Sequence, residues 1–201
     1  MTTMDRELLG KVLTHLGAFV IVIYAFDILK GFYARFLRGG KNLKKEYGDW
    51  AIVTGGTDGI GFAMAQQLAK KGLNILLISR TESKLVQCKT DLNGQFPNVE
   101  VRTLAIDYSS FDEAARKRVS VAIEDIKIGV LVNNVGMSYP FTKYFDELAD
   151  EDVTNLISLN VESTTWMTRI VLPGMLERKK GSIVNISSSN QFILYCCLHS
   201  R

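Results

Sequence analysis

The feature that most constrains this sequence is a glycine-rich segment at residues 54–61, directly after the apolar run at residues 50–53. Glycines let the backbone turn sharply and approach a ligand closely. A turn that opens into a helix also presents free N–H groups, which favour negative charge. The segment therefore predicts a phosphate-binding turn between a strand and a helix; the alternative is a tight loop without a ligand.

Apolar runs of strand length alternate with helical patterns over most of the chain. Continuous aliphatic strands separated by helices indicate a parallel sheet that is covered on both faces. Right-handed crossovers then predict an α/β, doubly wound, Rossmann-like fold with ligands at the carboxyl ends of the strands. The expected strands are residues 50–54, 74–79, 99–105, 129–133 and 182–187, and the expected helices are residues 59–71, 82–95, 111–127 and 151–178.

An apolar stretch precedes this region. Residues 12–26 carry no formal charge, and six lysines and arginines without an acidic residue lie between residues 30 and 45. The stretch is shorter than the about 20 residues that span a bilayer. A signal peptide, a buried helix and a membrane anchor are the alternatives. The basic cluster after the stretch favours an anchor, spanning or interfacial, with the following domain on the cytoplasmic side.

Composition divides the chain into four segments. Residues 1–37 are the expected anchor, 38–49 a basic linker, 50–188 a dinucleotide-binding domain and 189–201 a divergent tail. From residue 46 onward acidic residues slightly outnumber basic ones, which argues against a basic nucleic-acid-binding domain. The three cysteines have no metal-ligand spacing, and their odd number suits a reducing compartment. No metal site and no nucleic-acid partner are predicted.

The ends of the expected strands indicate the cofactor. Ser79 and Arg80 end the second strand, where an NAD site usually carries an acidic residue for the ribose. A guanidinium instead suits the 2′-phosphate of NADPH; the alternative is a solvated arginine at a strand end. Asp107 ends the third strand, and residues 133–136 (Asn-Asn-Val-Gly) end the fourth. All of these positions fall at the same edge of the predicted sheet.

Together these motifs resemble the short-chain dehydrogenases/reductases, over residues 48 to about 188. The turn matches their Thr-Gly-x-x-x-Gly-x-Gly pattern, and residues 133–136 are similar to their Asn-Asn-Ala-Gly motif. Residues 72–75, 78–80 and 172–175 look like the membrane-anchored branch of very-long-chain 3-oxoacyl-CoA reductases and 17β-hydroxysteroid dehydrogenases. The resemblance implies NADPH-dependent reduction of an acyl-CoA or steroid ketone at the endoplasmic reticulum membrane.

The resemblance also implies roles for individual residues. Asp107 would contact the adenine, and Asn133 would steady the sheet beside the cofactor. The implied cofactor-binding residues are Gly55, Thr57, Asp58, Gly59, Ile60, Gly61, Ser79, Arg80, Asp107, Asn133 and Gly136.

The family's catalytic set is a serine, a tyrosine, a lysine four residues after it, and an asparagine in the long helix. Asn160 matches the asparagine and is expected on the inward stripe of residues 151–178, with a purely structural role as the alternative. Ser188 matches the serine, with Ser187 and Ser189 as alternatives. No Tyr-x-x-x-Lys follows Ser188 in this sequence.

Without that motif the domain is expected to be C-terminally incomplete, and whether the chain is itself an enzyme stays open. One expectation is an NADPH-dependent oxidoreductase that reduces ketones. The second is a catalytically inactive form that binds NADPH or a full-length partner, and the third is a destabilised product. The resemblance is also compatible with a homo-oligomer, because family dimers often use the long helix, here residues 151–178, together with a second helix expected after the catalytic motif.

Overall fold

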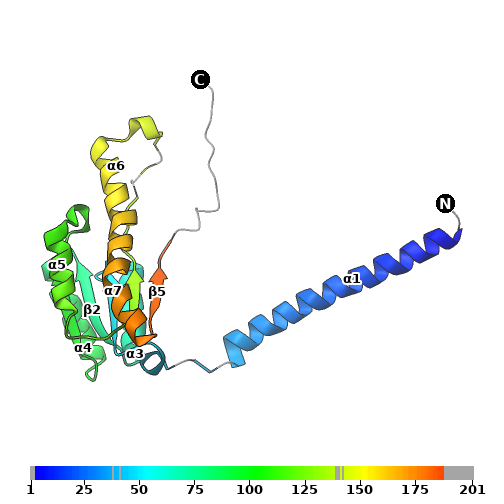
Figure 1. The fold of residues 1–201 in the computed structure, drawn as a ribbon, viewed down its shortest axis with the longest axis horizontal. Helices are drawn as coiled ribbons and strands as arrows, with labels where there is room; N and C mark the ends of the chain where they lie inside the picture. Colours follow the sequence, from blue (N-terminus) through cyan, green and yellow to red (C-terminus); the bar gives the residue numbers. More distant parts are fainter. Residues whose placement is uncertain (1–2, 38, 41, 139–140, 142, 188–201) are drawn as a thin grey trace. The chain divides into compact units, whose positions relative to one another are not determined.

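The computed structural model describes residues 3–37, 39–40, 42–138, 141 and 143–187 (Figure 1). The chain divides into two compact units, residues 1–41 and 42–201. The first unit contains helix α1 (Thr3–Phe32) and a π-helical turn (Tyr33–Leu37). Within the described residues, Gly10–Leu37 is the one helical segment long and apolar enough to cross a membrane; an 18-residue window of it has a mean hydropathy of 2.1 and no buried residues.

The second unit is built on a five-stranded parallel sheet in the order β3-β2-β1-β4-β5. This arrangement confirms the predicted α/β fold. Two predicted strands are too long: the third begins two residues later than expected and the fifth ends two residues earlier. The strands are β1 (Trp50–Thr54), β2 (Asn74–Ser79), β3 (Val101–Ala105), β4 (Ile128–Asn133) and β5 (Ser182–Asn185).

The helices follow the expected alternation, with three differences. A short helix lies in the predicted linker, where the Asn42 side chain caps its first turn. The helix expected at 111–127 is shorter at both ends, and the one expected at 151–178 is interrupted by a π-helical turn (Ser158–Glu162). The helices of the second unit are α2 (Leu43–Glu46), α3 (Gly59–Lys70), α4 (Glu82–Gln95), α5 (Glu113–Ala122), α6 (Asp150–Ile157) and α7 (Ser163–Arg178).

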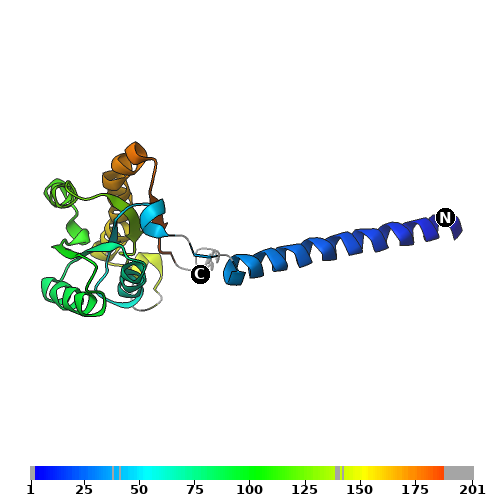
Figure 2. The same cartoon turned by 90° about the horizontal axis from the view of Figure 1, so that it is seen from below.

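Two hydrophobic layers enclose the sheet, because successive side chains of a strand point to opposite faces. Ala51 and Val53 of β1 pack in the layer of α3 and α4, whereas Trp50 and Ile52 pack in the layer of α5 and α7. Figure 2 shows the two helix pairs on opposite sides of the sheet. Because both faces of β1, β2 and β4 are covered, these strands are apolar except at their ends.

The segment before β1 crosses β4 at two glycines. Gly48 has a φ of +140°, and a Cβ on Gly129 would lie 2.6 Å from the Gly48 nitrogen. The Trp50 N–H also donates to the Lys127 carbonyl at 3.3 Å. Only a residue without a side chain allows this approach, so the two glycines fix the chain that enters the sheet against the start of β4.

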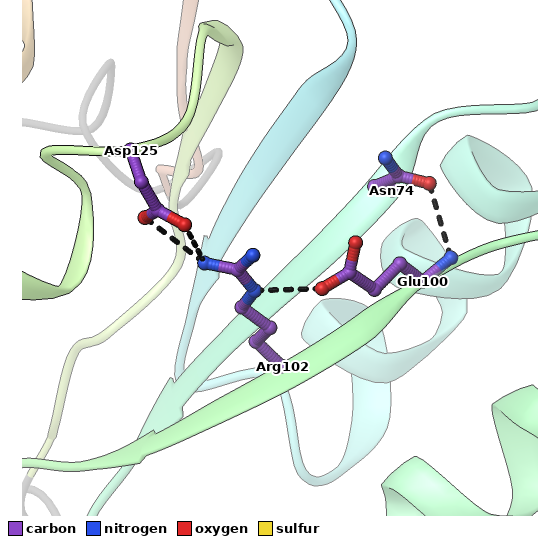
Figure 3. A network of polar contacts seen from close by, with 4 residues as sticks. All are labelled: Asn74, Glu100, Arg102 and Asp125. Atoms are coloured by element: carbon purple, nitrogen blue, oxygen red, sulfur yellow. Dashed lines mark hydrogen bonds and ion pairs between the residues drawn. The ribbon is translucent and has the colours of Figure 1, made fainter.

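An ion-pair network occupies the amino edge of the sheet beside β3 (Figure 3). Arg102 donates to Glu100 at 2.8 Å and to both oxygens of Asp125 at 3.0 and 2.8 Å. The guanidinium also lies 4.8 Å from the ring centre of Trp50. The hydrogen bond from Arg102 lowers the pKa of Asp125. Because the network is exposed to solvent, it positions β3 more than it stabilises the fold.

Candidate cofactor site

A cleft of about 640 Å³ lies at the carboxyl ends of the strands. Its walls come from the glycine turn after β1, the ends of β2 and β3, the loop after β4, and α6 with the π-helical turn. The lining residues are Gly55, Thr57, Ser79, Arg80, Thr81, Lys84, Ile106, Asp107, Tyr108, Ser109, Asn134, Val135, Gly136, Met137, Glu151, Asn155 and Leu159.

The turn after β1 uses glycines where side chains would be strained or would clash. Gly55 and Gly59 have positive φ angles of 62° and 49°. The Gly55 N–H donates to the Ile78 carbonyl at 2.8 Å, which fixes the turn to the end of β2. Asp58 caps α3 by accepting from the Gly59 N–H at 2.7 Å. The turn therefore places the N-terminus of α3 at the carboxyl edge of the sheet. Backbone N–H groups at a helix N-terminus favour the binding of an anion.

Two side chains join this turn to the loop after β4. The Thr54 hydroxyl is buried; it donates to the Val132 carbonyl and accepts from the Asn134 N–H at 3.0 Å. The Asn134 amide donates to the carbonyls of Thr54 and Gly55 at 3.2 and 3.1 Å. Gly61 packs against the same groups, so a Cβ at this position would clash with the Asn134 amide and the Gly55 carbonyl. The glycine turn is thus held in place by the loop after β4.

Two cationic side chains lie beside the end of β2, one directly after the strand and one in the first turn of α4. Arg80 and Lys84 are exposed and line the cleft. Among the described residues, neither side chain forms a hydrogen bond or an ion pair. Beside them, the Ser79 and Thr57 hydroxyls share a hydrogen bond of 3.0 Å. This corner of the cleft therefore offers two uncompensated positive charges and two hydroxyls, a set suited to a phosphate group.

The wall formed by β3 carries Asp107 and Tyr108. Asp107 accepts from the Ser109 N–H and hydroxyl at 2.9 and 2.8 Å, which caps a short 3₁₀ helix (Tyr108–Ser110). Tyr108 is 3% exposed, and its hydroxyl has no hydrogen-bond partner among the described residues. Burial raises the pKa of Tyr108 above its ordinary value.

We predict that Tyr108→Phe stabilises the fold. Removing a buried hydroxyl without a partner should raise the free energy of unfolding by about 1 kcal/mol at neutral pH. Above about pH 10 the gain should grow. There the unfolded tyrosine ionises while the buried one stays protonated, so the native chain loses stability as the pH rises. Denaturant unfolding of the full chain in detergent at about pH 7 and 10.5 measures both effects.

The exposed Tyr144 provides the matched control. Tyr144→Phe should change the free energy of unfolding little at either pH, because its hydroxyl is already hydrated. A Tyr108→Phe variant that is less stable than the native chain would show that the hydroxyl has a partner, and would contradict the prediction.

The structure corrects the placement of Asn160. We expected it on an inward stripe of a continuous helix, but the residue is exposed, and Ile157, three residues before it, is 52% exposed. The π-helical turn explains the difference, since the Ser163 N–H bonds to the Ser158 carbonyl five residues back. The Asn160 amide instead makes a pair of 3.0 Å hydrogen bonds with the N–H and C=O of Met137. It fixes the loop after β4 to the helix.

The structure brings together only part of the predicted cofactor set. Gly55, Thr57, Ser79, Arg80, Asp107 and Gly136 line the cleft. Asp58, Gly59, Ile60 and Gly61 lie in the turn and first helical residues behind it. Asn133 is buried and faces away, donating to Thr168 of α7 and Asn185 of β5. Ser188 lies outside the described residues.

Sequence reasoning missed Asn134 and Lys84. Asn134 directly follows the predicted Asn133, and consecutive residues at a strand end point to opposite faces. Lys84 lies in the first turn of α4, directly after the strand end that carries Arg80, and its position at the start of the expected helix at 82–95 was a usable signal.

Comparison with known proteins supports this geometry. The family described as short chain dehydrogenase matches residues 49–197. The very-long-chain 3-oxoacyl-CoA reductase of Mus musculus is 52% identical over 145 residues, which cover 71% of this chain and 46% of that protein. The inactive hydroxysteroid dehydrogenase-like protein 1 of Pongo abelii is 39% identical over 190 residues, which cover 94% of this chain and 56% of that protein.

Solved structures share the fold. A short-chain dehydrogenase from Sphingobium yanoikuyae in complex with NADPH has a TM-score of 0.65 and 30% identity, covering 71% of this chain and 55% of that one. The chain spans about half the length of the curated relatives it matches. The sheet order, the glycine turn and the match over residues 49–197 lead to one conclusion: the chain belongs to the short-chain dehydrogenase family.

Proposed function

We propose that the second unit binds NADPH in the cleft and belongs to a membrane-anchored reductase of ketones. The observation that carries the proposal is the pair of uncompensated cations, Arg80 and Lys84, beside the phosphate-binding turn. An exposed cation at a strand end is common, but two at one corner of the cleft provide a site for a second phosphate. NADPH differs from NADH by such a group, the 2′-phosphate.

The residues present fit this cofactor. The glycine turn places the N-terminus of α3 at the cleft, where the N–H groups beyond Gly59, which Asp58 caps, would meet a pyrophosphate. A side chain at Gly61 would displace the groups that support the turn. Arg80 would meet the 2′-phosphate with its planar fork, and Lys84 would add a point charge. Asp107 would accept from the adenine amino group, while Ile106 and Leu159 supply apolar walls.

When bound, NADPH supplies a hydride to a carbonyl carbon. The chain's own residues would orient both reactants: Asn134 holds the turn, and the Asn160–Met137 pair holds the loop that borders the cleft. By its match to the family pattern, Ser188 would orient the carbonyl. Asn160 would take part in moving the proton that the developing alkoxide needs.

The substrate and location belong to the same proposal. Relatives described as very-long-chain 3-oxoacyl-CoA reductases favour an acyl-CoA ketone, with a steroid ketone as the second candidate. The exposed apolar helix at Gly10–Leu37 and the lysines and arginines after it support an anchor in the endoplasmic reticulum membrane, with the second unit facing the cytoplasm.

One observation favours a second candidate function. The relative matched over most of this chain, 94%, is described as inactive. A unit that binds NADPH without reducing a ketone, alone or with a full-length or identical partner, would use the same cleft. Both candidate functions require NADPH binding, but only the first includes the reduction of a ketone.

Titration of the full chain with NADPH and with NADH tests the shared part. We expect NADPH to bind at least about tenfold more tightly than NADH, since charge-assisted hydrogen bonds to the 2′-phosphate are made only with NADPH. Calorimetry measures both dissociation constants, and NADPH oxidation with a 3-oxoacyl-CoA then separates reductase from binding unit. Equal affinity for the two cofactors would contradict the proposal.

A further inference from the structure

Charge is distributed unevenly over the second unit. Residues 42–201 carry 18 basic and 18 acidic residues, so the unit is neutral overall. The segment 143–152, which follows the carboxyl end of β4 and opens α6, carries five acidic residues and one lysine. At the opposite, amino edge of the sheet lies a set of exposed lysines that we call the basic edge: Lys44, Lys45, Lys127, Lys179 and Lys180. The unit therefore has a negative and a positive pole.

The fold gathers the basic edge from three distant segments. The Lys180 ammonium donates to the Lys45 carbonyl at 3.2 Å, across 135 residues of sequence. The carbonyl of Lys127 accepts from Trp50 at the start of β1. Lys179 adopts a left-handed conformation, with a φ of 53°, in the turn between α7 and β5. Because the strands are parallel, the segments before β1, β4 and β5 meet at one edge.

Ion pairs engage few of these lysines, although Glu46, Glu124 and Glu177 lie in the same segments and offset part of their charge. Within the described part of the chain, Lys44 alone of the five forms an ion pair, at 3.7 Å to Asp49. Glu100 and Asp125, the acidic residues next to β3 at the same edge, are held by Arg102 (Figure 3). The network described above thus removes two carboxylates that would otherwise offset the basic edge.

We propose that the basic edge docks on the surface of an anionic phospholipid bilayer. Charge complementarity is the first argument, since each lysine near an anionic lipid surface contributes favourably to the free energy of binding. Connectivity is the second argument, and it rests on the membrane anchor of the proposed function: the chain enters this unit at the basic edge, shortly after Arg35 at the end of the apolar segment and after Arg38 and Lys41. The acidic pole is repelled by the same surface. Docking therefore leaves the cleft, at the opposite edge of the sheet, open to water.

Energy transfer from tryptophan to lipid tests the orientation. The chain has two tryptophans, and Trp50 lies at the amino edge. In a Trp166→Phe background, Trp50 is the sole donor to dansyl-labelled phosphatidylethanolamine in nanodiscs that hold the full chain. We expect stronger transfer in discs with about 30% phosphatidylserine than in phosphatidylcholine alone, and loss of the difference in about 1 M salt.

Matched triple variants identify the surface. Lys127→Gln, Lys179→Asn and Lys180→Gln together should reduce the docking equilibrium about 100-fold and abolish the lipid difference. The control, Lys89→Gln, Lys117→Gln and Lys143→Gln, removes the same charge from exposed sites elsewhere and should behave as the parent. Equal transfer in both lipids, or equal loss in the two triple variants, would overturn the proposal. NADPH titration of the same discs keeps this result separate from the cofactor proposal.

Discussion

Arg80→Ala should weaken NADPH binding about 10- to 100-fold and leave NADH binding nearly unchanged. The guanidinium is uncompensated among the described residues, so removing it costs no native contact and acts on the 2′-phosphate alone. Calorimetric titration of the full chain with each cofactor measures the two dissociation constants. The effect should shrink in about 1 M salt, because the site is open to solvent and its charges are screened.

Two further variants sharpen this experiment. Lys84→Ala should cause a smaller loss than Arg80→Ala, since an ammonium lacks the two-pronged geometry of a guanidinium. Arg169→Ala removes an exposed arginine from α7, away from the lining of the cleft, and should leave both affinities unchanged. If Arg80→Ala lowered NADPH and NADH affinity equally, the arginine would act through the turn and would not contact the 2′-phosphate.

Gly61→Ala should destabilise the second unit by about 1–3 kcal/mol. In a helix, alanine is normally more favourable than glycine by roughly 0.5–1 kcal/mol, so the expected sign is opposite to the helical preference. The reason is that the new Cβ would meet the Asn134 amide and the Gly55 carbonyl, and a backbone carbonyl cannot move away without opening the turn. Thermal unfolding should show a decrease in Tm of about 2–12 °C.

Gly94→Ala is the matched control. Gly94 lies in α4, and a Cβ at this position would meet no neighbouring atom within 4 Å, so the same substitution should stabilise the chain by about 0.5–1 kcal/mol. Cofactor binding separates the two variants further, since displacement of Asn134 should also weaken NADPH binding. A Gly61→Ala variant as stable as Gly94→Ala would show that the turn is more pliable than its contacts indicate.

Much of the fold could be predicted because the sheet is buried on both faces. The bounds of β1 and β2 were predicted correctly, since their central residues are aliphatic and buried. The limits of β3 and β5 were less accurate, because β3 and β5 are the edge strands and most of their residues are half-buried. Periodicity carries less information where only part of a strand is covered.

The sequence predicted which strand ends form the site, but not the directions in which their side chains point. The sequence placed Arg80, Asp107 and residues 133–136 at one edge, and they do lie there. It did not show that Asn133 turns toward α7 while Asn134 turns toward the glycines. Asn160 failed for a related reason: a π-helical turn breaks the period on which the inward stripe was predicted.

The sheet order has a consequence for how the chain is made. Residues 50–105 contain β1, β2 and β3, which are neighbours in space, so three of the five strands can assemble once these residues are available. The other edge of β1 stays unpaired until β4 is synthesised, about 80 residues after β1. Only then can Gly129 pack against Gly48. In that interval a largely apolar central strand presents an unpaired edge, which is an arrangement prone to pair with other chains. A nascent chain paused between β3 and β4 should therefore depend on chaperones more than one paused after β4.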